Sequence, residues 1–161
     1  MRKQLLLIAA FILALDRFTK WLVIAKIPLY HEIDIIPGVF RLTHLENTGA
    51  AFSMFADISG PWPSRLLILL SLVALVVISI FLWKIGGTRN WSALALALFL
   101  GGTLGNLWDR LFQGTVTDFL DFYLGSHHWP PFNVADSAIV VAMVLLAGQV
   151  LLGKHEVGSP G

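Results

Sequence analysis

Four long apolar segments contain most of the hydrophobic positions of the chain, at residues 4–25, 65–83, 91–108 and 134–152. A helix needs about 20 mainly apolar residues to cross the hydrocarbon core of a bilayer, and each segment is close to that length. The pattern therefore predicts an all-α polytopic membrane protein with four transmembrane helices, forming a single membrane-embedded domain over residues 1–161.

The connections between these segments differ in length and in pattern. Two are long, at residues 26–64 and 109–133, and with four spans both would lie on the same side of the membrane. Within the first, residues 31–45 alternate between two faces, with a break at Pro37-Gly38, which predicts a small sheet on the membrane surface. The two faces are Val39, Arg41, Thr43 and Leu45 against Phe40, Leu42 and His44.

Basic residues favour one orientation of these spans. Arg2 and Lys3 precede the first segment, and Lys84 and Arg89 lie in the short connection between the second and the third. Because Lys and Arg near short loops and helix ends tend to stay in the cytoplasm, we expect cytoplasmic termini and external long connections. No small-residue cleavage site follows the first segment, so we expect it to be retained rather than removed as a signal peptide.

Composition agrees with lipid as the main solvent. Of the 161 residues, 57% are apolar and only 13% are charged, which is too little polar surface for a soluble domain of this size. The formal net charge of +1 gives no reason to expect a nucleic-acid partner. The chain has no cysteine, which excludes disulfides, thiolate nucleophiles and cysteine-based zinc sites.

Polar and ionisable residues near the ends of the apolar segments are the candidates for chemistry, because such groups are costly beside a membrane. Asp16 and Lys20 lie four residues apart on the first helix, and a structural ion pair at the helix end explains them well. Asn47 and Gly49 belong to a run of small residues around one amide, where glycine permits unusual backbone torsions. A plain turn explains that run equally well.

The third apolar segment ends on a polar face. Gly101 and Gly105 form a pair of small residues four apart, which lets two helix backbones approach closely. The polar face consists of Gly102, Asn106, Asp109 and Arg110, at helical spacing. Helix packing accounts for the glycines but not for an amide, a carboxylate and a guanidinium together, so we expect these polar residues to have a functional role.

Two carboxylates flank the entry into the fourth segment. Asp118 precedes it, separated by a turn at Pro130-Pro131, and Asp136 lies in its first turn, where it can also cap the helix. Two carboxylates held a few ångströms apart do not both ionise easily, so one keeps a proton near neutral pH. The ionised group can take a proton from water while the other hydrogen-bonds a substrate carbonyl, which is the arrangement of aspartic proteases.

Other chemistries fit the sequence less well. No His-x-x-x-His or His-Glu-x-x-His zinc pattern is present, and His127 and His128 are adjacent, so we expect neither a metal nor a cofactor. A Ser–Lys dyad at Ser137 or Ser53 stays open, although the candidate lysines are far away in the sequence. A transporter or lipid-binding protein that uses the two carboxylates for proton coupling is an alternative of a different class, and a non-enzymatic assembly partner is another.

Taken together, the motifs closely resemble those of the bacterial lipoprotein signal peptidases, the signal peptidase II family. The resemblance covers nearly the whole chain and rests on five motifs in the family's order and spacing. These are Asp16-x-x-x-Lys20, Asn47-x-Gly49-Ala50-Ala51-Phe52, Gly101-Gly102-x-x-Gly105-Asn106-x-x-Asp109-Arg110, Val116-x-Asp118-Phe119 and Phe132-Asn133-x-Ala135-Asp136-Ser137. One departure is Arg17, where the family usually has Gln.

The resemblance implies an intramembrane aspartic endopeptidase with Asp118 and Asp136 as its catalytic pair. The second Asp-Phe, at Asp121, matches less well because Phe119 rather than valine lies two residues before it. Supporting and binding positions of the family fall on Asn47, Asn106, Arg110 and Asn133, and we expect Gly49, Asp16, Lys20 and Asp109 to support the site as well.

The resemblance also implies a substrate, an inhibitor and a location. Such enzymes remove the signal peptide from diacylglyceryl-modified prolipoproteins, cutting just before the lipidated cysteine, and globomycin-type cyclic peptides inhibit them. Membrane lipids would surround the helices. The site would face the periplasm or the outer leaflet of the bacterial inner membrane, covered by a small extracytoplasmic β-cradle.

Overall fold

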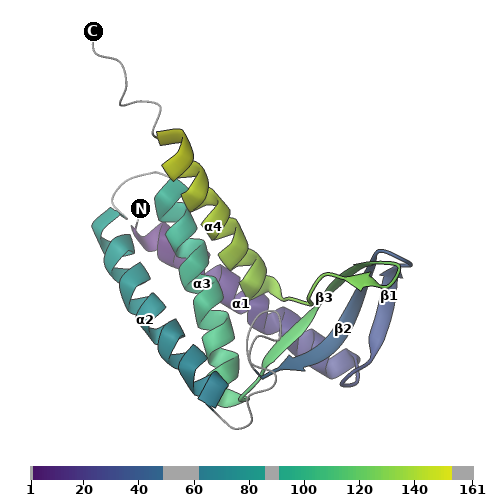
Figure 1. The fold of residues 1–161 in the computed structure, drawn as a ribbon. Coiled ribbons are helices and arrows are strands. Elements are labelled where there is room, and N and C mark those ends of the chain that lie inside the picture. Colours follow the sequence, from purple (N-terminus) through teal and green to yellow (C-terminus); the bar gives the residue numbers. More distant parts are fainter. Residues whose placement is uncertain (1, 49–61, 86–90, 154–161) are drawn as a thin grey trace.

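A computed structural model describes residues 2–48, 62–85 and 91–153 of the chain (Figure 1). The helices are α1 (Arg2–Lys26), α2 (Trp62–Ile85), α3 (Trp91–Phe112) and α4 (Val134–Gly153). The strands are β1 (Glu32–Ile36), β2 (Phe40–Asn47), β3 (Val116–Leu124) and β4 (His127–His128). Each predicted apolar segment is therefore helical, with differences of a few residues at the ends.

α3 is the central helix and packs against α1, α2 and α4. Its glycines make the approach of two neighbours possible. A Cβ atom at Gly101 would lie 2.6 Å from the carbonyl oxygen of Ala9 in α1, and one at Gly102 would lie 2.5 Å from the carbonyl oxygen of Ala135 in α4. The prediction that Gly101 and Gly105 let helix backbones touch is confirmed for Gly101, whereas Gly105 faces the side chain of Asp16 instead of a backbone.

Three helices, α2, α3 and α4, are long and apolar enough to cross a membrane by length and composition. Their outer surfaces are suited to contact with lipid. Only 11% of the most apolar stretch of α2 is buried inside the protein, and large apolar side chains such as Leu69 and Val144 are exposed. α1 does not meet the same criterion, because Asp16, Arg17 and Lys20 interrupt its apolar sequence. The structure thus supports three of the four predicted spans on this criterion.

The helices alternate in direction. The start of α1, the end of α2, the start of α3 and the end of α4 lie at one end of the bundle, and the sheet lies towards the other (Figure 1). Arg2 donates a hydrogen bond to the carbonyl oxygen of Trp83 at 3.0 Å, and Ser92 donates one to Gln149. These contacts join α1 to α2 and α3 to α4 at the end away from the sheet.

The sheet is antiparallel, with strand order β1-β2-β3-β4. The predicted hairpin is present, and Gly38 in its turn adopts a φ of +83° that favours glycine. The predicted alternation of faces fails at Thr43 and His44, which are both buried. The reason is a register shift between Leu42 and Leu45, where β2 bulges against β3.

β3 corrects the sequence analysis, which treated residues 109–133 as a connection. α3 continues to Phe112, and β3 then pairs with β2. Successive side chains of a strand point to opposite faces, so Asp118 and Asp121 lie on different faces of the sheet. Asp121 accepts a hydrogen bond from Arg41 of β2 at 2.7 Å. The sheet therefore separates these two carboxylates and assigns them different partners.

Candidate active site

Asn133, just before α4, links the two carboxylates that the sequence singles out. It is fully buried, and its side-chain amide donates to Asp118 Oδ1 at 2.8 Å. Its Oδ1 accepts from the backbone N–H of Asp136 at 2.9 Å, while its own backbone N–H donates to Asp136 Oδ2 at 3.3 Å. This is a reciprocal helix cap. One side chain thus connects β3 to the first turn of α4.

Two further amides bind the same carboxylates. Asn47, at the end of β2, donates to Asp118 Oδ2 at 3.1 Å. Asn106 of α3 donates to Asp136 Oδ1 at 2.7 Å. Asp118 is only 5% exposed, so its two oxygens depend on Asn47 and Asn133 for the hydrogen bonds that water would otherwise supply.

The pKa of Asp118 is raised to about 6, above its ordinary value of 3.8. Burial is the main cause, because it disfavours the charged form, and the nearby carboxylate of Asp136 adds to it. The hydrogen bonds from Asn47 and Asn133 and the charge of Lys20 act in the opposite direction. A carboxyl group of this kind exchanges its proton near neutral pH, as general acid–base catalysis requires.

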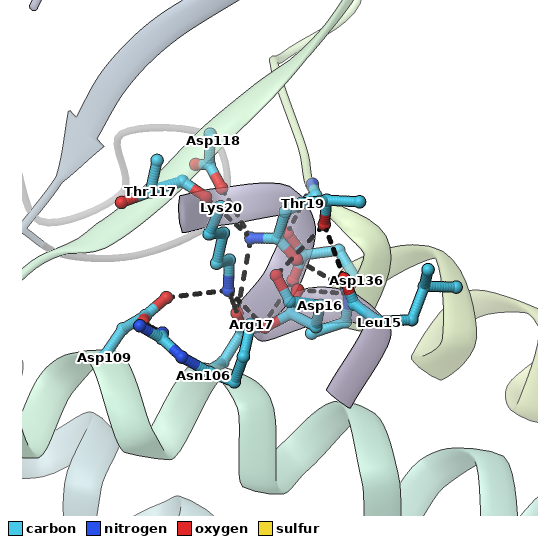
Figure 2. Close-up of polar contacts among 12 residues, drawn as sticks. Leu15, Asp16, Arg17, Thr19, Lys20, Asn106, Asp109, Thr117, Asp118 and Asp136 are labelled. Carbon is cyan, nitrogen blue, oxygen red and sulfur yellow. Dashed lines mark hydrogen bonds and ion pairs between the residues drawn. The ribbon is translucent and has the colours of Figure 1, made fainter. Parts of the chain in front are cut away.

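Lys20 of α1 lies among these groups with no exposed surface (Figure 2). Its Nζ donates to Asp16 Oδ2 at 2.8 Å and to Asn106 Oδ1 at 3.2 Å. It also lies 2.7 Å from Asp109 Oδ2, an ion pair whose angles fall outside hydrogen-bond geometry. Asp109 pairs with Arg17 as well. The fully buried Asp16, Lys20 and Asp109, together with the partly exposed Arg17, therefore form one network between α1 and α3.

Asp16 ties this network to α4. Its Oδ1 accepts from the backbone N–H of Ala135 at 2.9 Å. A Cβ atom at Gly105 would lie 2.6 Å from Asp16 Oδ2, so the glycine leaves the space that this carboxylate occupies. The expected pair of Asp16 with Lys20 is present, but it is buried and joined to the neighbours of the two carboxylates rather than isolated at a helix end.

The structure brings most of the sequence-derived site residues together at the sheet end of α3. Arg110 joins them by donating from Nη1 to the backbone oxygen of Asn106 at 3.3 Å. Gly49 lies outside the described residues. Arg17, for which the sequence pattern predicted no role, pairs with the buried Asp109. Its position three residues before Lys20, on the same side of α1, was the available signal.

Metal ligation has no obvious place in this arrangement. Across residues 2–48, 62–85 and 91–153, no three His, Asp or Glu side chains are grouped so that they would hold a metal ion. The chemistry that the described site offers is that of two carboxylates with amide and cationic neighbours.

Comparison with known proteins identifies the family. A family model described as signal peptidase (SPase) II matches residues 8–152. The chain belongs to the signal peptidase II family. The lipoprotein signal peptidase of Geobacter sulfurreducens is 50% identical to it over 139 residues, 86% of each chain. That of Solibacter usitatus is 43% identical over 152 residues, covering 94% of this chain and 93% of the other.

Solved structures share the fold of this chain. A bacterial membrane enzyme determined by the in meso method at 2.3 Å resolution matches with a TM-score of 0.87 and 25% identity, over 99% of this chain and 94% of the other. A second, at 1.9 Å resolution, matches with a TM-score of 0.79 and 26% identity, over 92% and 93%. The resemblance inferred from the motifs is confirmed, and the protein is a hydrolase of the aspartic protease type.

Proposed function

We propose that this signal peptidase II removes the signal peptide from prolipoproteins whose cysteine carries a diacylglyceryl group, cutting just before that cysteine. Asp118 and Asp136 are the catalytic pair. The observation that carries this assignment is the buried Asn133. Its side-chain amide donates to the carboxylate of Asp118 on β3, and its backbone N–H donates to the carboxylate of Asp136 on α4. The lipoprotein signal peptidases that resemble the chain support the substrate class.

The reaction needs one ionised and one protonated carboxyl group. Because two close carboxylates titrate as a pair, a single proton shared between them is the working state. The ionised member takes a proton from a water molecule as its oxygen attacks the scissile carbonyl carbon, and the protonated member donates to the carbonyl oxygen. The tetrahedral intermediate collapses when the leaving nitrogen takes a proton, and the pair returns to its starting state.

Cleavage of a lipidated substrate also sets a requirement on location. The diacylglyceryl chains stay in the bilayer, whereas the peptide bond must reach water and both carboxylates. Asp118 on the sheet and Asp136 at the start of α4 meet this requirement if the sheet lies on the outer surface of the inner membrane. The sheet then forms the cradle over the site.

We assign α1 as a fourth membrane span. Its 25 residues have a length of about 37 Å at 1.5 Å per residue, which exceeds a hydrocarbon core of about 30 Å. Asp16 and Lys20 have no exposed surface, and Arg17 is paired with Asp109, so none of the three charges faces lipid unpaired. Four alternating spans put the start of α1 and the end of α4 on one side of the membrane and the sheet on the other. Arg2, Lys3 and Lys84 favour the cytoplasm for the side without the sheet.

Single cysteines test this topology cleanly, because the chain has none of its own. Lys84, at the end of α2, and Ser126, beside β4, are both exposed. In intact spheroplasts we expect a membrane-impermeant maleimide to label the Ser126→Cys variant and to label Lys84→Cys only after permeabilisation. Labelling of both variants in intact spheroplasts would exclude the four-span arrangement.

Arg110 orients the bound peptide in this proposal. Its guanidinium is a planar fork of donors suited to backbone carbonyl oxygens, and one nitrogen already binds the backbone of Asn106. We expect Arg110→Lys to lower kcat/KM at least about tenfold, or about 1.4 kcal/mol in barrier, because an ammonium does not reproduce the fork. Arg65→Lys is the matched control, since Arg65 is exposed at the start of α2. Equal kcat/KM for Arg110→Lys and Arg65→Lys would reduce Arg110 to an interfacial anchor.

The proposed function itself is tested with purified protein and a synthetic diacylglyceryl-modified prolipoprotein, followed by the gel shift of the cleaved product. We expect cleavage in the presence of EDTA and its inhibition by a globomycin-type cyclic peptide. The same prolipoprotein without its lipid should be cleaved poorly. Failure to cleave the lipidated substrate, or activity that EDTA removes and zinc restores, would overturn the proposal.

A further inference from the structure

Lys20 makes more contacts with the neighbourhood of the catalytic pair than a simple helix ion pair requires. Its Nζ is bounded by Asp16 Oδ2 at 2.8 Å, Asp109 Oδ2 at 2.7 Å and Asn106 Oδ1 at 3.2 Å. A lysine ammonium has three N–H donors and no acceptor. Asp16 and Asp109 already supply two counter-charges, so the contact with the neutral Asn106 calls for a separate explanation.

That third contact, together with one from Asn133, fixes which way the Asn106 amide points. Asn106 Oδ1 receives Lys20 Nζ at 3.2 Å and Asn133 Nδ2 at 3.3 Å, and both of these groups are donors. The amide nitrogen is therefore directed at Asp136 Oδ1, to which it donates at 2.7 Å. A flipped amide would set its NH2 against two donors and its oxygen against a carboxylate. Lys20 thus acts on Asp136 through one intervening side chain.

The charges around the pair also depend on Lys20. Four acids and three bases face one another here: Asp16 and Lys20 with Arg17 from α1, Asp109 and Arg110 from α3, Asp118 from β3 and Asp136 from α4. With every group ionised the cluster carries one excess negative charge, so a single added proton makes it neutral. Without Lys20 neutrality would need two protons, and a doubly protonated pair has no base to activate water.

We propose that Lys20 is a positioning residue of the protease: its buried ammonium orients Asn106 towards Asp136 and holds the catalytic pair to a single proton. This inference rests on the proposed function, because it concerns the same pair of carboxylates. The charge of Lys20 also lowers the pKa of Asp118 against the larger effect of burial, which agrees with the role.

The test compares Lys20→Gln with Lys26→Gln on the lipidated prolipoprotein. Gln keeps a donor but loses the charge, and Lys26 is an exposed lysine at the end of the same helix. A lost cation favours the protonated carboxyls, so the singly protonated pair forms only at higher pH. We expect the acid limb of the pH profile of kcat/KM to move up by about one pH unit in Lys20→Gln, which lowers kcat/KM roughly tenfold at any pH on that limb. The pH profile of Lys26→Gln should be unchanged.

A purely structural ion pair predicts a different result. It would lower the melting temperature of Lys20→Gln and the yield of active enzyme, while the acid limb stayed at the pH of the parent. The shape of a pH profile does not depend on the fraction of active molecules, so the two roles separate. An unshifted acid limb in folded Lys20→Gln would overturn the proposal.

A second variant covers the case in which Lys20→Gln fails to fold because Asp16 has lost its cation. In Lys20→Gln/Asp16→Asn both charges of the pair are gone, and an Asn side chain still offers an oxygen to the N–H of Ala135. We expect its acid limb to return close to that of the parent, because three acids and two bases again leave one excess negative charge. Its kcat/KM should stay at least about tenfold below that of the parent, because no ammonium orients Asn106. A kcat/KM equal to that of the parent in this variant would also overturn the proposal.

Failure of the two proposals is distinguishable. If the parent enzyme does not cleave the lipidated prolipoprotein, the proposed function falls and the role of Lys20 falls with it. If the parent cleaves the substrate and only the predicted pH shift is missing, the proposed function stands and Lys20 has a structural role alone.

Discussion

Asp118→Asn and Asp136→Asn should each lower kcat/KM for a lipidated prolipoprotein at least about a thousandfold, equivalent to about 4 kcal/mol in barrier. An amide takes no proton from water, and a lone remaining carboxyl group cannot act as base and acid at the same time. Cleavage by gel shift gives the rate, and circular dichroism with a melting curve in detergent shows whether each variant is folded.

Glu46→Gln is the matched control for the loss of a carboxylate. Glu46 is exposed on β2, next to Asn47, so the change has the same chemistry close to the site but outside the network. We expect its kcat/KM to stay near that of the parent. Asp121→Asn is a poorer control, because Asp121 is buried and bound to Arg41. A loss of less than about tenfold in either catalytic variant would remove that residue from the mechanism.

The stability of Asp118→Asn relative to the parent should depend on pH, in a direction that follows from the raised pKa of Asp118 in the parent. The folded-state pKa of about 6 lies above the ordinary 3.8, so ionising Asp118 destabilises the fold increasingly as pH rises from about 4 through 6. Full ionisation costs roughly 1–3 kcal/mol, which an uncharged Asn avoids. Above pH 7 the inactive variant should therefore melt no lower than the parent.

Local patterns in the sequence predicted the helices and much of the candidate site. Apolar length predicts the four helical segments, and the spacing of Gly101 and Gly105 predicts close helix contact, because both signals depend on neighbours within one helix. The hairpin before α2 was also visible, since a glycine turn and alternation are local features. Asp118 and Asp136 were singled out because carboxylates beside membrane segments are costly.

What the sequence did not predict depends on partners far apart along the chain. β3 pairs with β2, about 75 residues earlier. Its polar residues, Asp118 and Asp121 among them, are typical of a loop until that partner strand is known. The bond from the N–H of Ala135 to Asp16 joins residues 119 apart. Contacts between residues so far apart produce no periodic pattern in the sequence. The role of Lys20 as the centre of a network is therefore visible only in the structure.

Gly102→Ala is the second change from which we expect a large effect. The new Cβ would lie 2.5 Å from the backbone oxygen of Ala135 and 2.9 Å from Ile139. Backbone does not yield as a flexible side chain does, so the first turn of α4 must move away from α3. Asp136 lies in that turn, and its 2.7 Å bond from Asn106 would lengthen.

We expect Gly102→Ala to lower kcat/KM about a hundredfold, the typical cost of displacing a catalytic group by about 1 Å, and to destabilise the fold by about 1–3 kcal/mol. Gly148→Ala is the control: Gly148 lies on α4 with nothing within 4 Å of a new Cβ, so alanine there should be neutral or slightly stabilising. Melting curves and cleavage rates of both variants decide the matter. If Gly102→Ala melts lower but cleaves at the parental rate, the contact with Ala135 serves packing only, and the position of Asp136 does not depend on it.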